Sequence, residues 1–222
     1  MPLRSYGQFC GIAHALDLVG ERWALLVVRE LILGPKRFTD LSRGLPGIGT
    51  NILSARLKEL EQAGIVSRRR LPPPAASTVY ELTEYGRGLE DILLALGRWG
   101  VRSMGPRVPG KALVAEWLAV ALVAYFQREA AEGVRATYEL KVGDAIFHAR
   151  VEDGNVEMQH GPATRPDLAL ETDEETLVAL FAGLVSPGDA AASGAIRMEG
   201  DEELLASLLA MFRFPLPEVV AQ

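Results

Sequence analysis

The 222-residue sequence predicts an α+β fold in two modules, and three observations support this division. Helical patterns and one basic hairpin fill the first half, whereas strand patterns followed by helices fill the second. Residues 1–105 contain 14 Lys and Arg and 10 Asp and Glu (net +4), whereas residues 106–222 contain 9 and 19 (net −10). The segment GPRVPG at 105–110 is typical of a linker. We therefore expect domains at 1–105 and 111–222, joined by a linker at 106–110.

The composition is that of an ordinary globular protein, with 49% hydrophobic and 23% charged residues. The one cysteine excludes an internal disulfide, and the first ten residues contain no apolar stretch of the kind that forms the central region of a signal peptide. The longest apolar run, from Val114 to Phe126, contains Glu116 and is too short to cross a bilayer. We expect a cytoplasmic protein that does not bind a membrane.

The first module begins with helical patterns. Apolar spacing predicts two helices in residues 10–35, a short helix from about Phe38 to Arg43, and a helix from Thr50 to Ala63 that Gly64 ends. A tight turn rich in Gly and Pro separates the last two helices. This order is the helix-turn-helix plan, whose second helix can enter the major groove of DNA.

The helix at 50–63 has two distinct faces. Three leucines share one face, and the other carries small or polar residues that suit contact with base edges. The leucines are Leu53, Leu57 and Leu60; the opposite residues are Asn51, Ser54, Ala55 and Lys58, with Arg56 at the flank. We expect Asn51, Ser54 and Lys58 to read bases, while Ala55 lets the helix approach closely.

A basic hairpin follows at 65–83, and it completes a winged helix-turn-helix that is mostly α with a β-hairpin wing. Arginines at the end of its first strand would meet phosphates or enter the minor groove. The alternative is a solvated helix face beside charged edge protection, but the combined features favour double-stranded DNA as the partner. The expected DNA-binding residues are Lys36, Arg37, Thr50, Asn51, Ser54, Ala55, Arg56, Lys58, Arg68, Arg69 and Arg70.

Residues 6–104 resemble the HxlR family of winged-helix transcriptional regulators, which are relatives of MarR. The stretches that carry the resemblance are YGQFCGIAHALDLVGERWALLVVREL at 6–31, GPKRFTDLSRGLPGI at 34–48, NILSARLKELEQAGIV at 51–66 and YELTEYG at 80–86. Where the family often has Ser, this chain has Gly49, so Thr50 is expected to cap the recognition helix instead.

The resemblance implies a homodimer on a roughly palindromic operator. It also implies that the first helix and the helix after the wing build the dimer interface. The later helix, within residues 87–104, has an apolar stripe of Leu89, Ile92, Leu93, Leu96 and Trp99. By itself that stripe is equally compatible with a core helix inside one chain.

Cys10 immediately precedes the first helix, where the helix dipole lowers the pKa of a thiol, and His14 lies one turn later. The resemblance implies a redox role, because some HxlR members use a cysteine here to sense oxidants or electrophiles. The alternative is a small half-buried residue that only fills space.

The sequence of the second module predicts a helix, then a sheet, and two further helices. An apolar helix is expected at 110–126, and strands at 136–142, 145–151, 156–160, 168–172 and 195–200. Helices at 173–185 and 201–212 should begin at the N-caps Asp173 and Asp201. We expect an antiparallel sheet with helices on one side.

Residues 111–215 resemble the sterol-carrier-protein type 2 fold. The resemblance rests on LKVGDAIFHARVEDG, PDLALETDEETLVALFAG and ASGAIRMEGDEELLASLLAMF, and it implies an apolar tunnel for a hydrophobic molecule. The alternative for each lining residue is a filled core position. The expected ligand-binding residues are Trp117, Phe126, Phe147, Phe181, Leu184, Met198, Leu208, Met211 and Phe212.

We expect neither catalysis nor a metal or cofactor. The three histidines, His14, His148 and His160, are scattered, and no nucleophile or phosphate-binding motif is present. The sequence therefore predicts a dimeric, sequence-specific transcriptional regulator that responds to a hydrophobic small molecule. Two alternatives stay open: a lipid carrier with vestigial DNA binding, and a thiol redox-sensing repressor that acts through Cys10.

Overall fold

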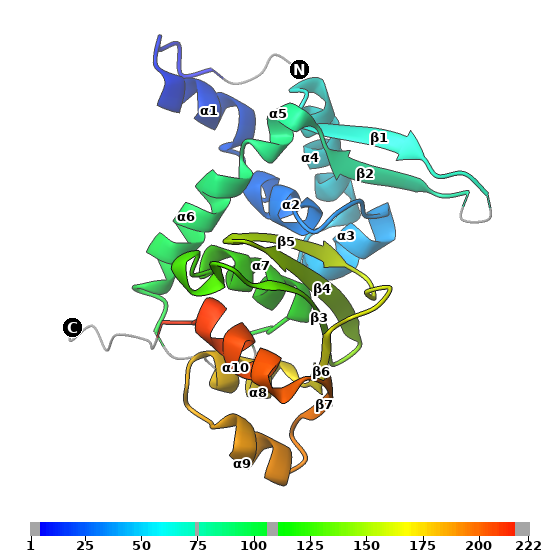
Figure 1. The fold of residues 1–222 in the computed structure, drawn as a ribbon. Coiled ribbons are helices and arrows are strands. Elements are labelled where there is room, and N and C mark those ends of the chain that lie inside the picture. The colour runs from blue at the N-terminus through cyan, green and yellow to red at the C-terminus, as the bar shows by residue number, and fades with distance from the viewer. Residues whose placement is uncertain (1–4, 74–75, 106–110, 216–222) are drawn as a thin grey trace. The chain divides into compact units, whose positions relative to one another are not determined.

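The computed structural model describes residues 5–73, 76–105 and 111–215, so the linker expected at 106–110 lies outside the described residues (Figure 1). The chain divides into two compact units, residues 1–93 and 94–222. Both helices and strands are present, which confirms the α+β class.

The first unit contains the helices, the tight turn and the hairpin that the sequence predicts. Its elements are α1 (Gly11–Val19), α2 (Ala24–Leu31), α3 (Phe38–Gly44), α4 (Thr50–Gln62), β1 (Val66–Arg70), β2 (Thr78–Leu82), α5 (Glu84–Arg87) and the start of α6 (Glu90–Val101). The two strands pair in antiparallel register from Val66 opposite Leu82 to Arg70 opposite Thr78. This arrangement is a helix-turn-helix followed by a β-hairpin wing.

Apolar side chains from three helices form the core of this unit. Leu53, Leu57 and Leu60 of α4 are buried, as predicted, and so are Val27 of α2 and Leu41 of α3. Gly64 follows the end of α4 with a φ of 71°, a left-handed conformation that glycine adopts without strain. The predicted stop of the recognition helix at Gly64 is therefore confirmed.

The expected cap of the recognition helix is wrong. Gly49 occupies the N-cap position in extended conformation, and Thr50 is already the first helical residue. A residue inside the first turn has helical backbone angles, so its side chain cannot cap that turn. The short α5 was not predicted. Thr83 caps its start by accepting a hydrogen bond from the amide of Gly86 at 3.0 Å.

The second unit is a five-stranded sheet with helices. Its elements are α7 (Ala115–Ala124), the 3-10 helix η1 (Glu129–Ala131), β3 (Arg135–Val142), β4 (Ala145–Glu152), β5 (Asn155–His160), β6 (Leu168–Thr172), α8 (Glu174–Phe181), α9 (Pro187–Ala192), β7 (Arg197–Gly200) and α10 (Glu202–Met211). The side chains of Asp173 and Asp201 cap α8 and α10 as predicted. The short α9, which Ser186 caps, was not predicted.

Two expectations about this unit need correction. The strand order is β5-β4-β3-β6-β7, and β3 and β6 run parallel, so the sheet is mixed rather than antiparallel. The reason is that the segment after β5 crosses the sheet and places β6 beside β3. The helix expected at 110–126 covers only Ala115–Ala124.

The two faces of the sheet differ sharply. Alternate residues such as Tyr138, Leu140, Phe147 and Leu170 are buried on one face, where α7 contacts β4 and β5 and α10 contacts β6. The helices thus cover one side, as expected, and Figure 1 shows the sheet against them. Within the described ranges, every helix is too short or too polar to span a bilayer.

Candidate DNA-binding surface

The recognition helix α4 presents three polar side chains to solvent on the face opposite its leucines. Asn51, Ser54 and Lys58 are exposed, and none has a side-chain partner among the described residues. Ala55, between them, is half-buried. An amide, a hydroxyl and an ammonium on one exposed helix face match the donors and acceptors that line the major groove.

Arg56 points elsewhere. Its side chain is only 14% exposed and forms ion pairs with Glu59 and, at 3.7 Å, with Glu21. A guanidinium held between two carboxylates is already neutralised, so it offers little to a phosphate. The structure therefore places Arg56 between two exposed carboxylates.

Lys36 is held by a buried carboxylate. Glu30, on α2, is 3% exposed, and its two oxygens accept from Lys36 Nζ at 2.8 Å and Arg29 Nη2 at 2.6 Å. A Cβ atom added to Gly44, the last residue of α3, would lie 2.2 Å from the same carboxylate. Glu30 therefore fills a space between α2, α3 and Lys36 that has no room for a larger side chain.

The backbone of Lys36 ties this cluster to the wing. Its amide donates to the carbonyl of Tyr80 at 3.0 Å, and the amide of Tyr80 donates back at 2.8 Å. Tyr80 belongs to β2, so one residue joins the buried carboxylate to the hairpin. The neighbouring Arg37 is exposed, and its amide donates to Asp40 Oδ2 at 3.2 Å.

The three wing arginines do not share one face. Side chains alternate along a strand, so Arg68 and Arg70 lie on one face of β1 and Arg69 on the other. Arg69 Nε donates to Glu81 at 2.7 Å, and Arg68 Nε lies 4.0 Å from Glu61. Arg70 is exposed and has no ion-pair partner among the described residues, so it is the most available cation of the wing.

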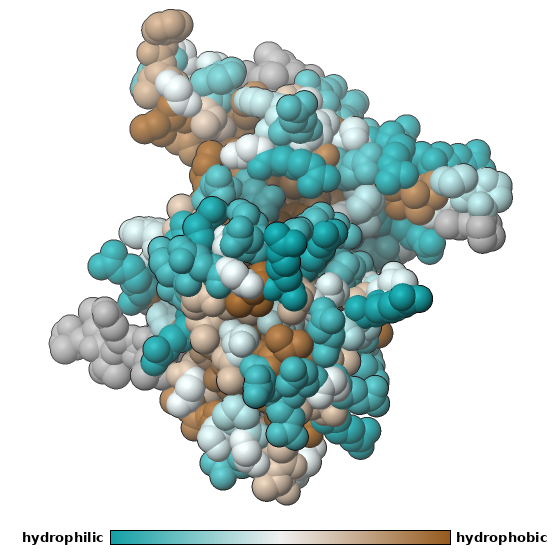
Figure 2. Space-filling model, viewed as in Figure 1, coloured by the Kyte–Doolittle hydropathy of each residue, from teal (hydrophilic) through white to brown (hydrophobic). Residues whose placement is uncertain are grey.

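Two helices leave apolar stripes open to solvent. Ile12 and Leu16 of α1 are exposed, together with Phe9 just before it, and Figure 2 shows hydrophobic atoms gathered over this helix. On α6 the exposed apolar residues are Ile92, Leu96 and Trp99, and Trp99 is 68% exposed. Exposed apolar stripes of this kind mark surfaces that another molecule covers.

Cys10 is exposed at the start of α1. The backbone amides of Ala13 and Ile12, in the first turn of α1, favour the thiolate and lower the pKa of Cys10 below its ordinary value. A thiol that ionises more readily is a better nucleophile at neutral pH.

The expected ligand-binding residues fall into three groups. Five are buried: Phe147, Phe181, Leu208, Met211 and Phe212. Trp117, Phe126 and Met198 are half-buried, whereas Leu184 is 64% exposed. Phe212 packs against Phe126 and Phe181 at centroid distances of 5.1 and 6.4 Å. Phe126, Phe181 and Phe212 thus form one aromatic cluster.

Sequence reasoning missed the organising role of Glu30. The one signal was a lone acid in the apolar run ALLVVRELILG, at a position that helical spacing buries. Among the described residues, no three His, Cys, Asp or Glu side chains gather as metal ligands would.

Comparison with known proteins separates the two halves of the chain. The HxlR-like helix-turn-helix family matches residues 18–108, and the alkyl sulfatase C-terminal family matches residues 111–218. YvaP, an uncharacterized HTH-type transcriptional regulator of Bacillus subtilis (strain 168), is 36% identical over 92 residues, which are 41% of this chain and 85% of YvaP.

One further relative and one solved structure are similar to parts of the chain. YodB, an HTH-type transcriptional regulator of the same organism, is 40% identical over 85 residues, which are 38% of this chain and 76% of YodB. The structure of the sec-alkylsulfatase Pisa1 from Pseudomonas sp. aligns with 53% of this chain and 19% of its own, at 18% identity and a TM-score of 0.47.

Replacing Glu30 by Gln should lower the free energy of unfolding by roughly 3 kcal/mol, because it leaves Lys36 and Arg29 beside an uncharged group in a buried site. Chemical denaturation measures the change. The matched control is Glu81→Gln, which breaks the exposed pair with Arg69 and should cost less than about 1 kcal/mol. Equal losses in the two variants would show that Glu30 has no special structural role.

Proposed function

This chain belongs to the HxlR-like helix-turn-helix family of transcriptional regulators, and on that premise we propose that it is a homodimer that binds a specific operator in double-stranded DNA. The observation that carries this proposal is the exposed polar face of α4 beside an arginine-bearing wing. Residues 18–108, which match the family, include all of the elements from α2 to α6.

The side chains divide into two roles. Asn51, Ser54 and Lys58 read base edges in the major groove, and Thr50 at the helix start lies where a phosphate would approach. Arg70 and Arg68 share the wing face that meets the DNA backbone, with Arg37 as a further phosphate contact. Lys36, Arg56 and Arg69 act mainly through their carboxylate partners, as supports of this surface.

The dimer forms through α1 and α6. Both helices carry exposed apolar stripes that a second copy of the chain would bury. The stripes include Ile12, Leu16, Leu96 and Trp99. A two-fold dimer presents two recognition helices, which suits an operator with two related half-sites.

The C-terminal unit is proposed as a sterol-carrier-like sensor of a hydrophobic effector, and the domain limits are proposed as 1–105 and 111–222. The aromatic cluster of Phe181 and Phe212 on the helix-covered face supports an apolar site. An effector could change operator affinity only by as much as it prefers one dimer geometry over another. We propose a regulator without enzymatic activity in the cytoplasm, because YvaP and YodB are named transcriptional regulators.

A second candidate is regulation through Cys10. The lowered pKa of its thiol and its full exposure favour reaction with an oxidant or an electrophile. Because Cys10 precedes α1, a modification there would act at the proposed dimer interface.

The DNA-reading roles are tested by anisotropy titrations on DNA selected for binding and on its single-base variants. Asn51→Ala should lose about 1–3 kcal/mol of preference at one or two positions only. Arg70→Ala should instead weaken binding to all sequences and make the log–log salt slope about one unit less steep.

The matched control is Asn155→Ala, which removes an exposed amide outside the first unit and should leave DNA binding unchanged. A uniform loss of affinity in Asn51→Ala, with no change of base preference, would overturn its role in reading bases.

Trp99→Glu should convert the dimer into a monomer of 24.0 kDa in light scattering coupled to size exclusion, because a charge would enter the apolar interface. Val185→Glu places the same charge at another exposed apolar position and should remain dimeric. A dimer that survives Trp99→Glu would place the interface elsewhere.

The Cys10 thiolate should form at a lower pH than an unperturbed thiol, since Ala13 and Ile12 donate to its charged form. Ultraviolet absorbance during a pH titration measures this ionisation, and Cys10→Ser is a clean blank because the chain has one cysteine. If oxidants release DNA equally from both proteins, regulation through Cys10 is excluded.

A further inference from the structure

The polar face of the C-terminal sheet carries a fixed strap, the segment at residues 161–167 that joins β5 to β6. Because β4 and β3 lie between these strands, the strap must cross them. Its Gly161 carbonyl accepts from His148 Nδ1 at 2.9 Å, and its Ala163 amide donates to Glu139 Oε2 at 2.8 Å. The amide of Asp167 donates to the carbonyl of Thr137 at 2.8 Å. The strap is therefore anchored at both ends and at Ala163.

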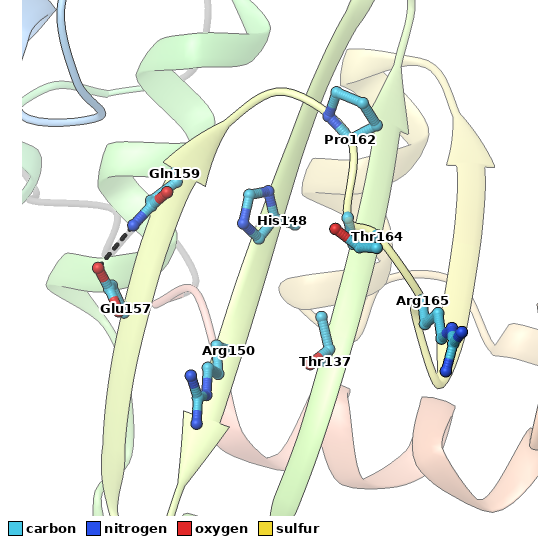
Figure 3. A pocket seen from close by; sticks show the side chains of 9 residues that line it. Thr137, His148, Arg150, Glu157, Gln159, Pro162, Thr164 and Arg165 are labelled. Atoms are coloured by element: carbon cyan, nitrogen blue, oxygen red, sulfur yellow. Dashed lines mark hydrogen bonds between the residues drawn. The ribbon is translucent and has the colours of Figure 1, made fainter.

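Between the strap and the strands lies an open hollow of about 550 Å³. Its volume is within the range of small-ligand sites. Figure 3 shows His148 near its centre, Glu157 and Gln159 on the β5 side, and Thr164 and Arg165 on the strap side. The lining residues are Thr137, His148, Arg150, Glu157, Gln159, Pro162, Ala163, Thr164 and Arg165.

The lining is rich in groups that bind anions. It holds two guanidiniums, an imidazole and two hydroxyls, whereas its one carboxylate, on Glu157, already accepts from Gln159 Nε2 at 2.6 Å. Arg150 also donates to Glu152 at 3.1 Å, but Arg165 has no ion-pair partner among the described residues. Two arginines in one hollow stand out in a half of the chain whose net charge is −10.

We infer that this hollow binds a small anion through a carboxylate, phosphate or sulfate group. A guanidinium donates two parallel hydrogen bonds to each of these groups. A carbonyl can only accept, so Nδ1 of His148 donates to Gly161. Nε2 then accepts from a hydroxyl of the ligand, or donates to its oxygens when the ring carries both protons. Because Pro162 and Ala163 are the only apolar lining residues, the site suits a small polar molecule.

This site is separate from that of the hydrophobic effector proposed above. The effector belongs to the helix-covered face of the sheet, whereas His148 and Arg150 point from the opposite face, as the alternation along β4 requires. The anion site therefore stands whether or not the effector proposal holds.

The test follows the imidazole of His148 by nitrogen NMR in the full chain, labelled with ¹⁵N-histidine. The three histidine signals can be assigned by substitution. Inorganic phosphate, sulfate and citrate are titrated separately, with potassium chloride at matched ionic strength as reference. We expect a saturable shift of the His148 signal with at least one of the three anions, and the responding anion identifies the group recognised. The signal of His14 should not move.

Arg150→Ala and Arg165→Ala should each weaken that binding by about tenfold or more, because each removes a charged hydrogen-bond donor. Arg197→Ala, on the edge strand β7 outside the hollow, should bind as the unmodified chain does. Both lining arginines are exposed, and circular dichroism checks that the variants fold. A His148 response no larger than that to chloride, or an equal loss in Arg197→Ala, would overturn the inference.

Discussion

The buried carboxylate of Glu30 is the interaction on which the proposed DNA-binding surface depends. A charge removed from water needs opposite charges and hydrogen bonds close by, and Glu30 obtains both from Lys36 and Arg29. The ion pair with Glu30 fixes the position of the Lys36 side chain. The backbone of Lys36 in turn pairs with that of Tyr80 in the wing. One electrostatic constraint thereby links the helix-turn-helix to the hairpin.

Most helices and strands could be predicted from local sequence patterns, but the pairing of the strands could not. Apolar spacing predicted α4, and alternation predicted β3 to β6, because both patterns are carried by neighbouring residues. Which strand lies beside which depends on the path of the chain between them, so the parallel pairing of β3 with β6 was missed. The capping role expected for Thr50 failed because helix boundaries shift by one residue without a change in pattern.

The same limit applies to the candidate site. The exposed positions of Asn51, Ser54 and Lys58 follow from the helical wheel alone. The ion pairs of Lys36 and Arg56 do not, because a charged side chain selects its partner from residues that only folding brings near. Sequence reasoning gave Arg56, Arg69 and Arg70 the same contact with DNA, whereas in the structure Arg56 and Arg69 have carboxylate partners and Arg70 has none among the described residues.

We propose above all that α4 and the β1–β2 wing recognise a specific DNA sequence. The most direct measurement is the affinity of the unmodified chain for its own promoter region and for scrambled DNA, each at two salt concentrations. We expect tighter binding to the promoter and, for a dimer with roughly eight phosphate contacts, a log–log salt slope of about −7. Equal affinity for both DNAs at both salt concentrations would contradict the claim.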